Sequence, residues 1–241
     1  MLSGSRSIFI ALALLSTSFV YSQETKSDTS FLARSKKNSI EFYTAFSEDQ
    51  SRLYNGGDYV LYMPADEEHP YFESDDWTNG SIVFWGELYE NVPLLYDLTI
   101  DEPITEQNRG NAIRLAGEKV ERFIIFGHHF VRLHQDEMNK MAEGFYDRLY
   151  DGKSKVYAKY SKSYQQTLSG YKVIPRFDES KKYYLVKDGI FYSVKTKASL
   201  LRVLNHRQEV KNFMRKNHIQ LTANRETAFV RVAEFYDTLK D

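Results

Sequence analysis

Short runs of alternating apolar and polar residues, separated by turn dipeptides, extend from Arg52 to Val194. Alternation with a period of two is typical of strands that bury one face, and Asn-Gly and Asp-Gly tolerate the positive φ angles of tight hairpin turns. The expected turns are Asn55-Gly56, Asn79-Gly80, Gly86-Glu87, Asp151-Gly152 and Asp188-Gly189. The pattern therefore predicts an antiparallel β domain over residues 39–195.

Two of these hairpins predict a register. A two-residue loop at Asp188-Gly189 puts apolar residues opposite each other on one face. Its opposed pairs are Lys187 with Ile190, Leu185 with Tyr192, and Tyr183 with Val194. A four-residue loop in the stretch 144–160 pairs Leu149 with Val156 and Phe145 with Tyr160, and leaves Arg148, Tyr157, Tyr146 and Lys159 on a wetter face. Both stretches are predicted to be half-buried hairpins.

Past Lys195 the apolar period becomes helical. Thr196 is a suitable N-cap for a first helix, a short second helix carries Val210, and a third begins at Asn224. The third helix places one apolar stripe on a single face: Phe229, Val232, Ala233, Tyr236 and Leu239. We expect residues 196–241 to pack on the β domain. The predicted fold class is mainly β, as an antiparallel meander, sandwich or partly closed barrel, with a C-terminal helical subdomain (α+β).

The first 22 residues, MLSGSRSIFIALALLSTSFVYS, have the pattern of a secretory signal peptide. Arg6 precedes an apolar run over residues 8–15, which is too short for a bilayer core that needs about 20 residues. We expect cleavage between Ser22 and Gln23, a polar flexible leader over residues 23–38, and no transmembrane anchor after processing. The predicted location is periplasmic or extracellular.

Composition narrows the classes of function. Lys and Arg number 32 against 33 Asp and Glu, and no basic block is present, so nucleic acid is not an expected partner. The chain has no Cys, which excludes disulfides, thiolate metal sites and a cysteine nucleophile. Tyr contributes 18 residues, a type that favours strands. A protein held together by its core alone fits a bacterial envelope.

The segment GHHFVRLH holds the nearest approach to a metal cluster. His128 and His129 are the metal candidates, but neighbouring residues on a strand point to opposite faces. Only a turn or bulge at Gly127 would bring the two rings together. We therefore expect no metal and no cofactor.

An acidic loop, MPADEEHPYFESDDWTNG, holds the candidate ligand-binding residues Trp77, Asp75 and Asp76. Clustered carboxylates suit calcium, but an EF-hand register from Asp75 puts Trp77 at the third ligand position, so that match fails. A solvated loop is the alternative. Trp77 could form an exposed stacking platform for a sugar ring, whereas Trp85 is expected in the core.

Several segments carry a resemblance: YNGGDYVLY, GSIVFWGELYENVPLLYD, FGHHFVRL, YYLVKDGIFYSVKTKASLLRVL and AFVRVAEFYDTL. In this order they resemble an uncharacterised family of exported, signal-peptide-bearing β-rich proteins from Bacteroidetes with no assigned activity. The resemblance covers most of the mature chain and implies a cell-envelope location and a β-rich fold followed by helices. It implies no functional residues.

Catalytic signatures are missing from the sequence: there is no Gly-rich phosphate loop, no Gly-x-Ser-x-Gly elbow and no His-Glu-x-x-His helix. The favoured function is a non-enzymatic interaction or structural module of the envelope, with an envelope protein or a glycan as partner. The alternatives are a glycan-active hydrolase that uses acids of residues 66–76, and a small-ligand or sugar-binding β protein with a cavity inside a closed meander.

Overall fold

The computed structural model describes a single compact unit within Asp49–Asp241. The described residues are 52–54, 56–62, 68–107, 110–135, 141–169, 171–222 and 224–239. The predicted signal peptide, its cleavage site at Ser22 and Gln23, and the leader over 23–38 all lie outside them.

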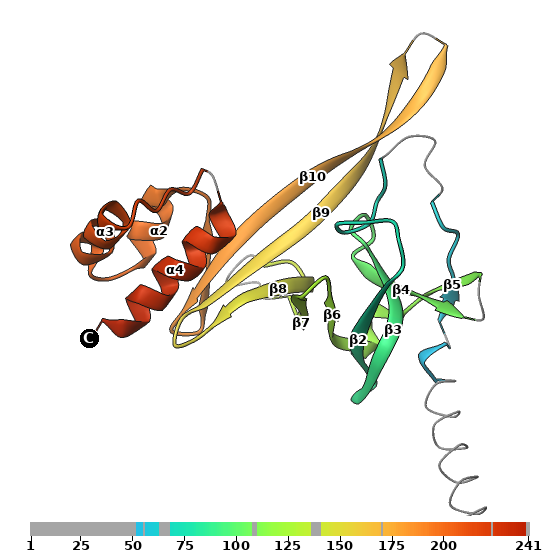
Figure 1. Ribbon diagram of the computed structural model, residues 1–241, viewed down its shortest axis with the longest axis horizontal. Coiled ribbons are helices and arrows are strands. Elements are labelled where there is room, and N and C mark those ends of the chain that lie inside the picture. The colour runs from blue at the N-terminus through green and yellow to red at the C-terminus, as the bar shows by residue number, and fades with distance from the viewer. Residues whose placement is uncertain are drawn as a thin grey trace, which may run out of the picture. The chain divides into compact units, whose positions relative to one another are not determined.

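The described strands form one open antiparallel sheet of eleven strands (Figure 1). They are β1 (Gly57–Asp58), β2 (Thr78–Phe84), β3 (Glu87–Asp97), β4 (Glu102–Gln107), β5 (Asn111–Arg114), β6 (Val120–Ile125), β7 (His128–Leu133), β8 (Gly144–Asp151), β9 (Lys155–Ser169), β10 (Lys172–Lys187) and β11 (Ile190–Val194). Their spatial order is β1-β5-β4-β3-β2-β6-β7-β8-β9-β10-β11. The prediction of a mainly β fold with C-terminal helices is confirmed. This sheet ends at β1 and β11, so the eleven described strands do not close into a barrel.

The turn at Asp188-Gly189 has the predicted register. Both residues have positive φ angles, 53° and 76°, and all three expected pairs are present. The turn expected at Gly86-Glu87 lies one residue earlier, at Trp85-Gly86, also with two positive φ angles. Trp85 is therefore 61% exposed, with the Lys119 ammonium 4.4 Å from its ring centroid. The expectation that Trp85 lies in the core was wrong, because the turn takes its side chain out of the strand pattern.

Asn79-Gly80 was predicted as a turn but lies inside β2, at a bulge between Gly80 and Ser81. A Cβ atom on Gly80 would lie 2.2 Å from the backbone oxygen of Ile124 on the neighbouring strand. This glycine therefore permits a close backbone approach and does not reverse the chain.

The β8–β9 hairpin also differs from the prediction. Asp147 pairs with Ala158 in the expected register, but a bulge after Arg148 gives Val156 the partner Tyr150 and not Leu149. The face expected to be wetter is partly apolar: Tyr146 and Tyr157 are buried there in a cluster with Met141 and Val186. Ring contacts on this face join Tyr146 to Tyr184 and Tyr157 to Phe191, in each case across one intervening strand.

Three helices follow β11: α2 (Lys197–Val203), α3 (Arg207–Lys216) and α4 (Arg225–Thr238). Thr196 and Asn224 cap α2 and α4 as predicted, each accepting a hydrogen bond from the backbone N–H three residues on. Four residues of the α4 stripe are buried and the fifth, Leu239, is partly buried against the same core; α4 contacts β8 and β9. None of the helices in the described part of the chain is both long and apolar enough to span a bilayer. A short 3-10 turn, η1 (Gly117–Lys119), precedes β6.

A substitution at Gly189 tests the β10–β11 turn. Gly189→Val forces a β-branched residue to a φ of 76° and should lower the free energy of unfolding by at least about 1 kcal/mol, measured by denaturant titration. Gly189→Asn is the matched control, because Asn tolerates this conformation and should cost less. Equal stability of the Val variant and the wild type would contradict the prediction.

Candidate functional site

The candidate residues of the acidic loop do not form one site. Asp75 and Asp76 are exposed, and the Asp76 N–H donates to Ser74 Oγ at 3.0 Å. Trp77 is half-buried and packs against a small cluster that includes Tyr71 and Leu95. The Trp77 ring is thus partly covered by its own fold and is not a fully exposed stacking platform.

The two candidate histidines have different surroundings on β7. His128 is half-buried, with Nδ1 2.6 Å from Asp147 Oδ2, whereas His129 is exposed and its backbone N–H donates to Asp147 Oδ1 at 3.1 Å. No three His, Asp or Glu side chains gather at metal-binding geometry in the described ranges. The partner of His128 is therefore a buried carboxylate.

A hydrogen-bonded network extends from this pair to α4. The Tyr160 hydroxyl lies 3.2 Å from Asp147 Oδ2 and 3.1 Å from Glu226 Oε1, and Tyr183 donates to the same Glu226 oxygen at 3.3 Å. Burial, then the two carboxylates, raises the pKa of Tyr160, so its phenol remains a donor. The network ties the first turn of α4 to the sheet. No local sequence pattern marks the pairing of Glu226 with these tyrosines, because they lie 66 and 43 residues away along the chain.

His128 should make stability depend on pH. The hydrogen bond to Asp147 raises the pKa of His128, although burial opposes it. A raised folded-state pKa means that this stabilisation is complete below about pH 6.5, the unfolded value, and is lost as pH rises through the folded value. The free energy of unfolding should thus fall over that window in the wild type.

His128→Ala should remove this pH dependence and cost about 1–3 kcal/mol below pH 6.5, because it leaves buried Asp147 with one donor fewer. Chemical denaturation at a series of pH values measures both effects. His134→Ala is the matched control, since His134 is exposed. An unchanged pH slope in His128→Ala would refute the prediction.

A second buried network joins the β3–β4 turn to β8 and β9. The Asp101 carboxylate accepts from Lys159 Nζ at 2.5 Å, from the Phe145 N–H at 3.2 Å and from the Tyr96 hydroxyl. Lys159 also donates to the Phe145 carbonyl at 2.9 Å. Burial lowers the pKa of Lys159, and Asp101 opposes this effect. A Cβ atom on Gly144 would lie 2.0 Å from Asp101 Oδ2, so the carboxylate occupies space that only glycine leaves open.

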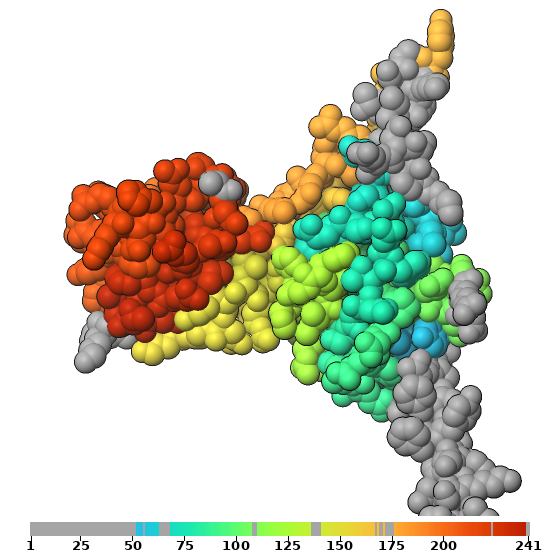
Figure 2. Space-filling view, viewed as in Figure 1, coloured from blue at the N-terminus to red at the C-terminus, as the bar shows by residue number. Residues whose placement is uncertain are grey.

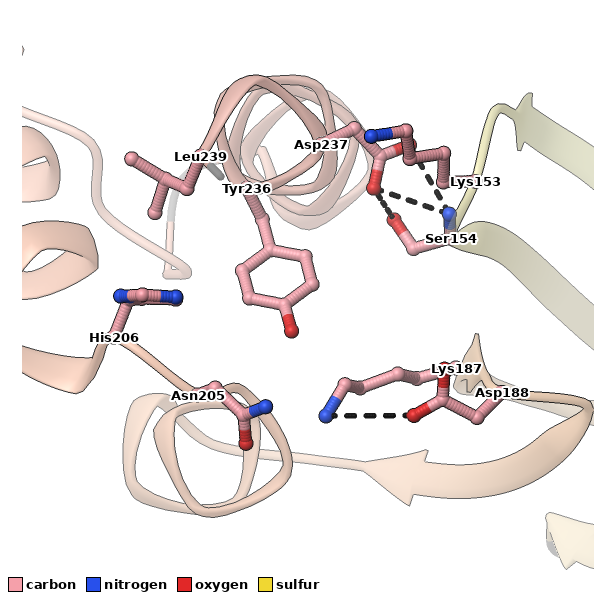
Figure 3. Close-up of a pocket in the computed structure, with 9 residues that line it drawn as sticks. All are labelled: Lys153, Ser154, Lys187, Asp188, Asn205, His206, Tyr236, Asp237 and Leu239. Carbon is pink, nitrogen blue, oxygen red and sulfur yellow. Dashed lines mark hydrogen bonds and ion pairs between the residues drawn. The ribbon is translucent and has the colours of Figure 1, made fainter. Parts of the chain in front are cut away.

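A polar pocket of about 340 Å³ lies where the helices meet the hairpin turns (Figure 3). Four segments line it: the β8–β9 loop, the β10–β11 turn, the α2–α3 link and the end of α4. The lining residues are Lys153, Ser154, Lys187, Asp188, Asn205, His206, Tyr236, Asp237 and Leu239. No local sequence pattern marks this site, because its residues are distant along the chain.

One wall of this pocket is held by Asp237. Its carboxylate accepts from the Ser154 hydroxyl at 2.8 Å, from the Ser154 N–H at 3.0 Å, and from the Tyr150 hydroxyl at 3.1 Å. On the opposite side, Lys187 Nζ is 3.6 Å from Asp188 Oδ2, and its side chain is only 17% exposed. The Tyr236 hydroxyl points from α4 toward Lys187 and Asn205 (Figure 3).

The outer part of the β9–β10 hairpin projects away from the sheet (Figures 1 and 2). We call residues 163–169 and 171–176 the β9–β10 arm. Strand β8 pairs with β9 only over residues 155–158, and β11 pairs with β10 only over 183–187. Near the tip, Leu168 is 75% exposed and Tyr171 is fully exposed. The arm is thus a two-stranded ribbon with apolar side chains in solvent.

No family model, curated protein or solved structure matches this chain. The resemblance to exported Bacteroidetes proteins stays a prediction. Two features of the fold, the arm and the pocket, are therefore the candidates for function.

Proposed function

We propose that this chain is an exported envelope protein whose β9–β10 arm binds an extended segment of another envelope protein. The observation that carries the proposal is the outer edge of β9. Beyond Lys162, whose N–H donates to the Leu98 carbonyl at 3.1 Å, no described residue pairs with that edge. An unpaired edge strand is a template for strand addition.

The register of the β9–β10 hairpin determines which backbone N–H and C=O groups point to its two outer edges. Backbone groups of alternate residues on a strand point to the same side, so those of Tyr164, Gln166 and Leu168 face the open edge with that of Lys162. The outer edge of β10 differs. There the Phe177 N–H donates to Glu68 Oε2 at 2.8 Å, and the outward position 175 is a proline, which has no N–H. A partner strand is therefore better accommodated on β9.

The charge pattern defines the partner. Proteins usually protect an edge strand with Lys, Pro or a bulge, yet residues 163–169, SYQQTLS, contain no charged residue and no proline. A partner strand that pairs with this edge would therefore contact no charged side chain, and every outward residue of the edge has a backbone N–H to donate. We infer a partner segment that is extended and carries little charge, with apolar side chains that cover Leu168 and Tyr164.

In-cell photo-cross-linking tests the proposal. A benzophenone amino acid at Tyr164 should give one discrete adduct with another envelope protein, whereas the same group at Lys211 on α3 should not. Gln166→Pro removes one outward N–H and should abolish the adduct; Gln166→Ala keeps that N–H and should retain it. An adduct unaffected by Gln166→Pro, no adduct, or an adduct between two copies of this chain would each overturn the proposal.

The location is part of the same proposal. The N-terminal sequence supports export with cleavage between Ser22 and Gln23. Mass spectrometry of protein from the periplasm or medium should find Gln23 as the first residue. An intact Met1 on protein recovered from the cytoplasm would contradict export.

A further inference from the structure

We propose that the pocket between α4 and the β10–β11 turn binds a neutral saccharide unit. The site is independent of the β9–β10 arm, because none of its lining residues belongs to the arm. Its volume of about 340 Å³ falls within the range of small-ligand sites, roughly 300–1,000 Å³.

The charges of the pocket favour a ligand without net charge. Two lysines, Lys153 and Lys187, are balanced by two carboxylates, Asp188 and Asp237. Lys187 and Asp188 form an ion pair at 3.6 Å, and Asp237 is held by donors from Ser154 and Tyr150. The carboxylates would repel an anion about as strongly as the lysines attract it. The lysines would likewise offset the attraction of a cation to the carboxylates.

The hydrogen-bonding groups favour hydroxyls. A hydroxyl both donates and accepts, so a sugar requires donors and acceptors in one site. Lys187 and the Asn205 amide group donate, the Asn205 amide oxygen and Asp188 accept, and the Tyr236 hydroxyl can do both. The ring of Tyr236 and the side chain of Leu239 supply apolar surface for the C–H groups of a sugar ring.

The lining is also preorganised, which lowers the cost of binding. Asp237 is fixed by hydrogen bonds from the Tyr150 hydroxyl on β8 and from the N–H and hydroxyl of Ser154 in the β8–β9 loop. A Cβ atom on Gly152 would lie 2.4 Å from Asp237 Oδ2, so the loop approaches the carboxylate closely. Tyr236 is nearly buried and held within the main apolar cluster. The groups that would contact a sugar are thus positioned before it binds.

Calorimetric titration of the purified full mature chain tests this site with three neutral probes: glucose, galactose and N-acetylglucosamine. At least one should bind saturably, while inorganic phosphate should not. Tyr236→Phe removes only a hydroxyl, and Asn205→Ala removes only an amide. Each should weaken binding about tenfold, which is about 1.4 kcal/mol. Asn212→Ala, on the exposed side of α3, is the matched control and should bind as the wild type does.

The outcomes separate clearly. Loss of affinity in Tyr236→Phe and Asn205→Ala, with wild-type binding by Asn212→Ala, supports the site. Binding of none of the three sugars, equal binding by all variants, or tighter binding of phosphate than of sugar would overturn it. Unchanged melting temperatures of the two pocket variants exclude misfolding as the cause of any loss.

Discussion

A chain that ends at Asn224 is expected to aggregate or to melt far below the full protein. The truncation removes α4, whose Phe229, Val232 and Tyr236 are buried against the sheet and the other helices. Fully burying a large apolar side chain stabilises a fold by roughly 1.5–3 kcal/mol, so several such losses approach the total of about 5–15 kcal/mol typical of a domain.

The truncation also removes hydrogen bonds between α4 and the β domain. It removes Glu226, the acceptor of Tyr160 and Tyr183, and Asp237, the acceptor of Ser154. A chain that ends at Leu239 is the control and should melt like the full protein, as measured by calorimetry and light scattering. If the chain that ends at Asn224 stayed monomeric and equally stable, the α4 stripe would not be part of the core.

Lys159→Met should lower the free energy of unfolding by about 3 kcal/mol. The change leaves the Asp101 carboxylate partly buried without its cation, and removing one member of a buried ion pair is more costly than removing both. The double variant Asp101→Asn with Lys159→Met should regain part of the loss, which chemical denaturation of all four proteins in a double-mutant cycle would measure.

An exposed ion pair is the control for this experiment. Lys155 lies 2.8 Å from Asp151, but both side chains are more than 40% exposed, so Lys155→Met should cost less than about 1 kcal/mol. Equal effects of Lys155→Met and Lys159→Met would show that burial does not decide the strength of the Asp101–Lys159 pair.

Local chemistry made some elements predictable. The β10–β11 register follows from Asp188-Gly189, because a turn with two positive φ angles determines which residues face each other. Thr196 and Asn224 were identifiable as caps because a cap acts on a backbone N–H only three residues away. In each case the deciding interaction lies within one short stretch of chain.

Other features depend on neighbours that no local pattern reveals. Trp85 reads as a core residue by alternation, yet the chain reverses there and exposes it. The Asn79-Gly80 pattern predicts a turn, yet Gly80 lies within a strand. The backbone of the neighbouring strand approaches so closely there that a side chain would not fit. The bulge after Arg148 likewise shifts Leu149 out of its predicted pairing.

The sequence by itself thus determined a β-rich chain followed by three helices, two of them with identifiable caps and the last one amphipathic, because period and turn chemistry are local properties. Only the tertiary structure decided which side chains meet. Lys159 reaches Asp101 across 58 residues, and Ser154 reaches Asp237 across 83. The pocket combines four such distant segments. Strands β8 and β11 pair only with the base of the β9–β10 hairpin, so no described residue pairs with the outer edge of β9 beyond Lys162. These contacts depend on how the strands and helices pack, and the period of a sequence specifies which face is buried but not what it is buried against.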